Sequence, residues 1–85
     1  MAEKELIASG IGDVPSWLAN EGLELAEKYF EDHDLIPEDC YEAYNNGNNS
    51  QLANYWVQAE KIANNVLAGD ERYENSMINL EFDEY

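Results

Sequence analysis

The sequence is poor in basic residues: Lys and Arg together number 4 against 19 Asp and Glu, which gives a formal net charge of −15 at pH 7. A protein that holds nucleic acid through its own phosphate contacts needs clustered Lys and Arg. Docking on anionic lipid needs basic clusters too. The charge balance therefore rules out direct nucleic-acid binding and argues against a membrane-surface protein.

Cysteine and long apolar runs are also scarce. The single cysteine, Cys40, excludes an intramolecular disulfide and a Cys-rich zinc site, and it fits a reducing compartment. No apolar run approaches the roughly 20 residues of a membrane span. The N-terminus, MAEKELIASG, lacks the basic start and apolar stretch of a signal peptide. With 45% apolar residues, the chain has enough for a core. We expect one cytoplasmic domain over residues 1–85.

The apolar spacing is helical along most of the chain. Positions three or four apart repeat as apolar stripes, which is the period of an amphipathic helix. The pattern predicts helices at 2–9, 16–32, 37–46, 51–68 and 71–79. Residues 80–85 alternate apolar and acidic, so they form either an edge strand or an extended tail, with the possible tail placed at 79–85. The predicted fold class is all-α, a compact bundle of four or five short-to-medium helices.

Capping residues mark the starts of three of these helices. Asp13 or Ser16 is expected to cap the helix at 16–32, with Pro15 in its first turn. Ser50 is expected to cap the helix at 51–68, and Asp70 the last one.

Four residues carry expectations about packing. Gly22 costs about 1 kcal/mol relative to Ala inside a helix, so it is expected to admit a close neighbour. Trp17 and Trp56 fall on or beside apolar stripes and are expected in the core. Cys40 is expected to be a buried structural thiol.

The acidic residues are unevenly distributed. Residues 1–42 carry 12 of the 19 acids and residues 70–85 carry 6, whereas residues 43–69 contain only Glu60. The helix at 51–68 is therefore expected to be the nearly neutral centre of the core, with the acidic elements packed around it.

Carboxylates follow one another at helical spacing through the first long helix. The run leads in with Glu21, continues at spacings of three or four, and extends beyond the helix: Glu24, Glu27, Glu31, Asp34, Glu38, Asp39 and Glu42. Duplex DNA carries one charge per roughly 1.7 Å of axis, so fifteen charges match roughly 25 Å of duplex. A helix of about 16 residues is roughly 24 Å long. Like charges at this spacing destabilise a helix, which suggests that the negative field is itself functional; the alternative is charge kept only for solubility.

Residues for catalysis or metal binding are few. Catalysis needs a nucleophile or base held by a partner group. The one histidine, His33, lies between Asp32 and Asp34 and is expected to face solvent. Ile36 and Pro37 fall where a calcium loop needs ligands or its glycine. We expect no enzyme activity, no cofactor and no metal site.

In size, charge and carboxylate placement, the chain resembles the small acidic DNA-mimic inhibitor proteins of phages and mobile elements. The resemblance rests on no shared motif, so no residue role is carried over from that group. It implies an inhibitor of the anti-restriction or anti-CRISPR type that blocks the basic nucleic-acid-binding cleft of a host defence or DNA-binding protein. The implied partner is a basic nucleic-acid-binding protein or nuclease complex in the cytoplasm of a bacterial host cell.

The candidate partner-binding residues are the acids of residues 21–42, a second acidic group after residue 69, and two tyrosines. They are Glu21, Glu24, Glu27, Glu31, Asp32, Asp34, Glu38, Asp39, Glu42, Asp70, Glu71, Glu74, Tyr41 and Tyr44. The alternative function is an acidic protein–protein adaptor or assembly module that binds through exposed Tyr41 and Tyr44. The protein is expected to be a monomer or a homodimer.

Overall fold

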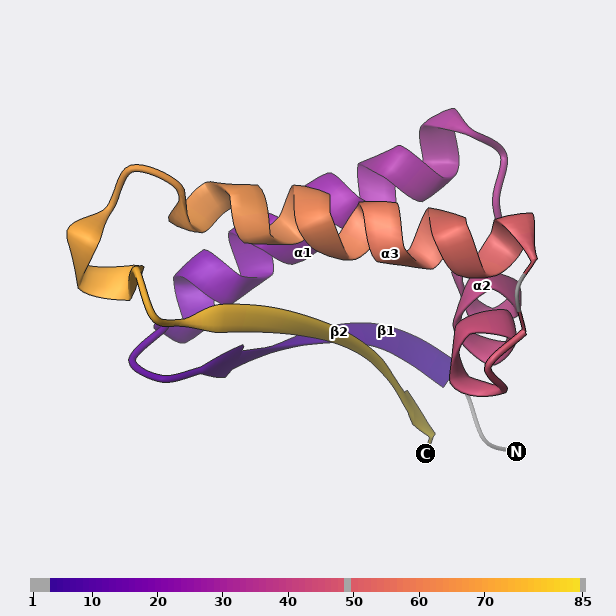
Figure 1. Cartoon of the computed structure of the whole chain (residues 1–85), viewed down its shortest axis with the longest axis horizontal. Coiled ribbons are helices and arrows are strands. Elements are labelled where there is room, and N and C mark those ends of the chain that lie inside the picture. The colour runs from indigo at the N-terminus through magenta and orange to yellow at the C-terminus, as the bar shows by residue number, and fades with distance from the viewer. Residues whose placement is uncertain (1–3, 49, 85) are drawn as a thin grey trace.

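Three helices cover one face of a two-stranded antiparallel sheet in the computed structural model, which describes residues 4–48 and 50–84 (Figure 1). The element order is β1 (Lys4–Ile11), α1 (Ser16–Asp32), α2 (Pro37–Asn45), α3 (Gln51–Asn64), two 3-10 turns η1 (Asn65–Leu67) and η2 (Glu71–Tyr73), and β2 (Met77–Glu84). Helices α1 and α3 lie over the sheet and α2 stands at one end. The fold is α+β, so the prediction of an all-α bundle is wrong.

The segment at 2–9 was predicted to be helical, but Lys4–Ile11 forms strand β1; residues 2 and 3 lie outside the described part. The strand forms through long-range pairing, since Leu6 lies opposite Phe82 and Ala8 opposite Leu80. These inward residues pack against the helices. The segment has little strand propensity of its own, so the partner strand decides its conformation.

The structure also corrects the prediction for the C-terminal segment. The helix predicted at 71–79 is only the 3-10 turn η2, and β2 begins at Met77. Of the two alternatives for 80–85, the strand holds as far as Glu84, and residue 85 lies outside the described part. The alternation of Ile78, Leu80 and Phe82 is the period of a strand with one buried face, and it overrides helix propensity.

The three long helices lie where the spacing predicted them. Helix α1 has the predicted bounds and α2 ends at Asn45, one residue early. Helix α3 ends at Asn64 and passes into η1, short of the predicted 68. The Ser50 cap is confirmed, because its Oγ accepts a hydrogen bond from the Ala53 N–H at 3.4 Å. The α1 cap is wrong: Pro15 occupies that position without a side-chain bond.

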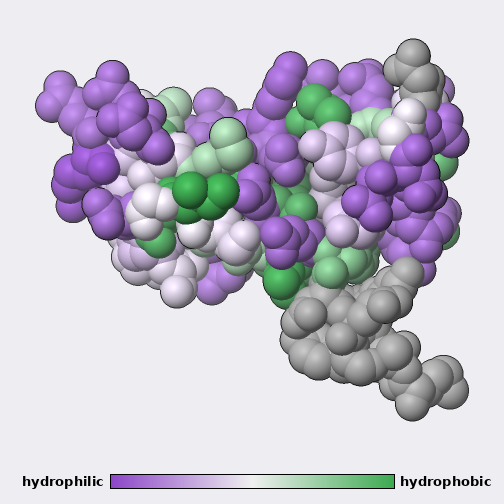
Figure 2. All heavy atoms as spheres, turned by 60° about the horizontal axis from the view of Figure 1, so that its bottom comes forward, coloured by the Kyte–Doolittle hydropathy of each residue, from purple (hydrophilic) through white to green (hydrophobic). Residues whose placement is uncertain are grey.

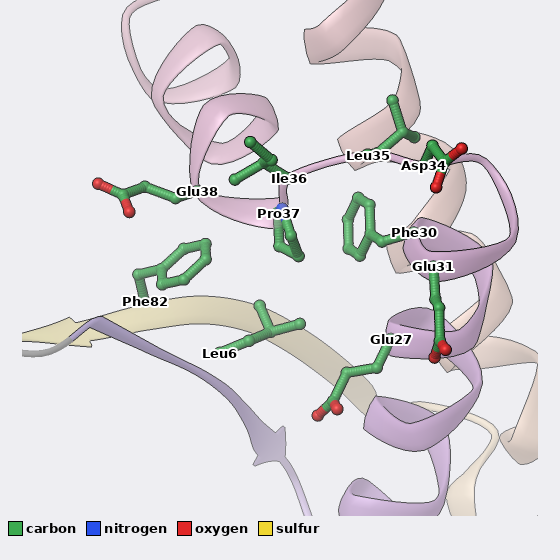
Figure 3. Close-up of a pocket in the computed structure, with 10 residues that line it drawn as sticks. All are labelled: Leu6, Glu27, Phe30, Glu31, Asp34, Leu35, Ile36, Pro37, Glu38 and Phe82. Carbon is green, nitrogen blue, oxygen red and sulfur yellow. The ribbon is translucent and has the colours of Figure 1, made fainter.

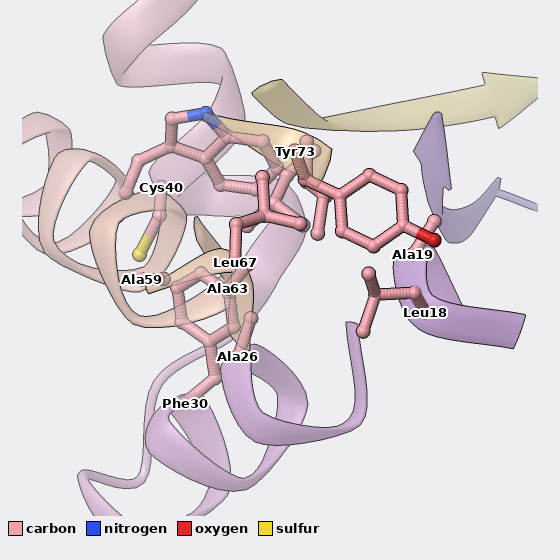
Figure 4. Close-up of a cluster of buried hydrophobic side chains, with 12 residues drawn as sticks. Leu18, Ala19, Ala26, Phe30, Cys40, Ala59, Ala63, Leu67 and Tyr73 are labelled. Atoms are coloured by element: carbon pink, nitrogen blue, oxygen red, sulfur yellow. The ribbon is translucent and has the colours of Figure 1, made fainter. Parts of the chain in front are cut away.

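An aromatic cluster forms the centre of the core. The fully buried Trp56 of α3 stacks on Phe30 of α1 at 5.8 Å and on Phe82 of β2 at 6.1 Å between ring centroids. Tyr41 of α2 meets the same indole edge-on at 5.1 Å. The buried thiol of Cys40 is confirmed (Figure 4). Helix α3 is thus the central core helix, in contact with α1, α2 and β2.

Gly22 gives α1 its close approach to α3, as expected. A Cβ at position 22 would lie 2.6 Å from the Ala63 carbonyl oxygen and 3.1 Å from the Ile78 Cδ1. The backbones of the two helices therefore meet at a point where any side chain on residue 22 would hold them apart.

Candidate acidic interface

One side of α1 is acidic and faces solvent. Its buried residues are Leu18, Ala19, Gly22, Ala26 and Phe30, all on the side that meets α3 and the sheet. Glu21, Glu24, Glu27, Glu31 and Asp32 are exposed on the remaining surface. We call this surface the α1 acidic stripe. Lys28 also lies in it and is exposed.

Trp17 lies on the same side as the stripe and is 64% exposed. The expectation that it belongs to the core is wrong. Residues 17, 21, 24, 28 and 31 recur every three or four positions, so they share one face of the helix. The buried residues of α1 centre on the other side of the helix, so Trp17 points away from the core. This spacing is the signal in the sequence that could have placed Trp17 at the end of the stripe.

The chain turns sharply between α1 and α2. Asp34 has a φ of 53°, in the left-handed region, and the Leu35 N–H donates to the Phe30 carbonyl oxygen at 2.8 Å. Pro37 then begins α2, where its missing N–H costs no bond. This turn places the acids that follow α1 beside those of its last turns.

A groove of about 780 Å³ opens at this turn, between α1, the start of α2 and the sheet. We call it the corner groove. Its apolar lining is Leu6, Phe30, Leu35, Ile36, Pro37 and Phe82, and its acidic lining is Glu27, Glu31, Asp34 and Glu38. Figure 3 shows the rings of Phe30, Pro37 and Phe82 and the side chain of Leu6 turned toward the centre. The carboxylates of Glu27 and Glu31 lie on the α1 side, and Glu38 lies across from them.

The remaining candidate residues of α2 divide between surface and core. Asp39 and Glu42 are exposed. Tyr44 is 46% exposed, whereas Tyr41 is half-buried and packs edge-on against Trp56 and Phe82. Of the two tyrosines proposed for an interface, only Tyr44 presents a large part of its surface to solvent.

The acids after residue 69 lie at the other end of the molecule. Turn η2 and helix α2 occupy opposite ends of the long axis in Figure 1, along which the molecule extends 36 Å. Asp70, Glu71 and Glu74 line a second groove of about 760 Å³ together with Lys61. The Arg72 guanidinium bonds the Asp70 carboxylate at 2.9 Å, and these hydrogen bonds lower the pKa of Asp70. The fold therefore separates this group from the acids of α2.

His33 and Cys40 do not form a reactive pair. The exposed His33 has its Nδ1 2.9 Å from the Tyr29 carbonyl oxygen and its ring 4.4 Å from that of Tyr29. Burial, and secondarily Asp39, raises the pKa of the Cys40 thiol, which disfavours the thiolate. Among residues 4–48 and 50–84, no group of three or more His, Cys, Asp or Glu side chains is placed to hold a metal ion.

The sheet side of the molecule is largely hydrophilic. Figure 2 brings the lower side of Figure 1 forward and shows hydrophobic residues there in small, separate patches. At one end of the sheet, Ile11 and Met77 pair and each is 50% exposed. Within the described part of the chain, no helix has the length and apolar character needed to cross a membrane.

Comparison with known proteins found no similar protein. No protein-family model matches the chain, and neither the curated proteins nor the solved structures contain a significant match.

Proposed function

We propose that this protein is a non-enzymatic inhibitor that imitates the charge of duplex DNA and occupies the basic nucleic-acid-binding cleft of a host defence or DNA-binding protein. The observation that carries the proposal is the α1 acidic stripe. Its exposed carboxylates lie along one side of a 17-residue helix, and an exposed tryptophan, Trp17, lies at the start of that helix. A helix of that length extends about 25 Å, which is close to the length of duplex whose charge equals the net charge of −15 of the whole chain.

The placement of charge supports this proposal. No charged or polar residue of the described chain is buried, so the acids whose side chains are described contribute to the external field. A field of one sign accelerates association with an oppositely charged cleft, and the effect weakens with added salt. Carboxylates along the stripe would pair with the Arg and Lys side chains that normally hold phosphates; the planar guanidinium donates hydrogen bonds to both carboxylate oxygens.

Trp17 would supply the contact that slows dissociation. Exposed charge pairs contribute little affinity each, whereas a buried aromatic ring often dominates an interface. Trp17 is 64% exposed and stands at the start of the stripe, so a cleft that accepts the carboxylates would also cover the indole.

The test is competition with duplex DNA. Basic DNA-binding proteins, including a restriction endonuclease and a CRISPR nuclease complex, are loaded with fluorescent duplex, and its anisotropy is followed as this protein is added. We expect displacement from at least one of them, with inhibition that falls steeply as NaCl rises. If saturating protein leaves the duplex bound to every one of these proteins, the proposal is wrong.

Two charge-matched variants separate the stripe from net charge. Glu21→Lys/Glu24→Lys reverses two charges within the stripe, and Asp13→Lys/Glu81→Lys reverses two exposed charges outside it. Because both variants have the same net charge, equal losses of inhibition would show that only the overall charge acts. We expect the stripe variant to lose at least about tenfold more affinity than its partner.

The adaptor alternative makes a different prediction. Binding through tyrosine would resist salt and survive reversal of the stripe, and it would fall on Tyr44→Ala. Tyr41→Ala is not a clean test of an interface, because Tyr41 packs on Trp56 in the core.

A further inference from the structure

The corner groove combines an apolar floor with an acidic rim. Its floor includes Ile36, which is 61% exposed, and its rim carries the four carboxylates named above. Of the side chains that the structure describes, no Lys, Arg or His lines the groove. An apolar ligand alone would contact only the floor, and a simple cation would contact only the rim.

The geometry points to a docking site for a cationic amphipathic segment of a partner protein, in which Arg or Lys flanks an aliphatic side chain. The aliphatic side chain would cover Ile36 and the exposed part of Phe82, and the flanking cations would meet the rim. This inference rests on the proposed function and deepens it, since it names the part of the partner's cleft that the protein would grip.

The floor is rigid, which favours a stable contact. Phe82 is half-buried, and its ring stacks on the buried indole of Trp56 at 6.1 Å between centroids and 27° between planes. Phe30, which is 1% exposed, stacks on the same indole from within the core. The exposed part of Phe82 is thus held in place by the core. A preformed pocket costs less ordering on binding than a flexible surface.

The rim also favours cations on long side chains, such as those of Arg and Lys. Glu31 and Asp34 are exposed on either side of the α1 terminus, and Glu38 approaches from α2. The exposed carboxylates of Glu31 and Asp34 lie beside the floor, so a ligand with cations next to its aliphatic group meets the floor and these carboxylates together. Arg and Lys carry apolar stems that can lie along the floor while their charges remain at the rim.

The test uses a capped five-residue peptide of alternating arginine and leucine as probe. One control peptide replaces each leucine by serine, and the other replaces each arginine by neutral citrulline. Affinity is measured by titration calorimetry, and the contact is mapped through amide chemical shifts of the full chain. We expect each control to bind about tenfold more weakly than the probe, with the largest shifts at the corner groove.

Protein variants locate the contact. Ile36→Ser removes an apolar side chain from the floor at a helix N-cap, a position where Ser is well tolerated. Glu31→Gln/Asp34→Asn neutralises two rim charges, and Asn suits the left-handed backbone of residue 34. Each should weaken the probe about tenfold, whereas Glu21→Gln/Asp32→Asn, which neutralises two acids outside the groove, should weaken it less than about twofold. Circular dichroism checks that every variant is folded.

Several outcomes would overturn the inference. Equal binding of the serine peptide would show diffuse charge attraction, and equal binding of the citrulline peptide would show a purely apolar site. Shifts centred on Trp17 or on the second groove would place the contact elsewhere. Self-association that Ile36→Ser abolishes would assign the groove to a second copy of the chain.

The inference and the proposed function can fail separately. A chain that binds the probe in the groove but never displaces duplex DNA from a basic protein refutes the function and leaves the docking site. The opposite result is also possible. If Glu31→Gln/Asp34→Asn displaces duplex DNA as well as the unaltered chain does, while Glu21→Lys/Glu24→Lys no longer displaces it, the docking site is refuted and the proposed function stands.

Discussion

The carboxamide of Asn64 bonds to both backbone polar groups of Ile78. Its Oδ1 accepts from the Ile78 N–H at 2.8 Å, and its Nδ2 donates to the Ile78 carbonyl oxygen at 2.8 Å. In an antiparallel pair, alternate residues direct their N–H and C=O groups away from the partner strand. Asn64 thus takes the place of a neighbouring strand at this point and ties α3 to β2.

Asn64→Ala should therefore destabilise the protein by about 2 kcal/mol, because it leaves both backbone groups of the buried Ile78 without their partner. Urea unfolding followed by circular dichroism measures the change. Asn65→Ala alters the exposed neighbouring residue and is the control, with an expected change below about 0.5 kcal/mol. Similar losses in the two variants would contradict a specific role for the Asn64 bridge.

Gly22→Ala should also destabilise, against the ordinary preference of helices for alanine. The added Cβ would approach the Ala63 carbonyl oxygen to 2.6 Å, so the backbones of α1 and α3 must separate. Overpacking of this kind costs about 1–3 kcal/mol, more than the roughly 1 kcal/mol gained in helix propensity. Asn20→Ala, at an exposed position of α1, should leave stability unchanged or raise it. A melting temperature for Gly22→Ala above that of the unaltered chain would disprove the close approach.

Ile36→Ser should stabilise α2. Residue 36 is the N-cap of this helix and provides no side-chain hydrogen bond. A serine hydroxyl at an N-cap accepts from the first turn and contributes about 1 kcal/mol, and little burial is lost because Ile36 is largely exposed. Thermal melting should show a rise of about 4–8 °C per kcal/mol. Ile36→Ala lacks the hydroxyl and should show no such rise; an equal rise would refute capping as the cause.

The helices could be predicted from the sequence because their signals are local. The spacing of Leu18, Ala26 and Phe30 and the cap at Ser50 each depend on a few neighbouring residues, and the structure has them in place. Strand β1 could not be predicted in this way, since its conformation depends on Phe82 and Leu80 at the far end of the chain.

The α1 acidic stripe could also be predicted from local spacing, whereas the corner groove could not. Helical spacing placed Glu21, Glu24 and Glu31 on one exposed face, which the structure bears out. The corner groove was not foreseen, because its floor combines Leu6 and Phe82 from the sheet with Ile36 from a turn. The sequence alone contains no distance between those three elements.

Added salt should stabilise the folded state. With a net charge of −15, repulsion among the acids opposes compaction, and ions screen it. The urea midpoint should rise between about 0.02 and 0.5 M NaCl, and it should rise less in Glu21→Lys/Glu24→Lys, whose net charge is smaller. A midpoint that falls with NaCl would mean that ion pairs outweigh the repulsion.

Stability should decline in alkaline solution partly through Cys40. Burial raises the pKa of this thiol above its ordinary 9.0, so the unfolded chain releases the proton first. The contribution is complete below about pH 9 and is lost as the pH rises through the folded-state pKa. Urea unfolding under reducing conditions at several values between about pH 8 and pH 10 should show a shallower decline for Cys40→Ala than for the unaltered chain. Equal slopes would show that the thiol does not contribute.

The pairing of β1 with β2 sets an order on folding. Lys4 meets Glu84 and Ile11 meets Met77, so the sheet cannot form on the ribosome until nearly all of the described chain has emerged. Until then the underside of α1 and α3, with Phe30 and Trp56, has no cover from the sheet. Incompletely folded chains that expose such surface tend to aggregate. The same carboxylates that we assign to a partner would keep neighbouring nascent chains apart during this interval, so the acidity would protect the protein before it is complete.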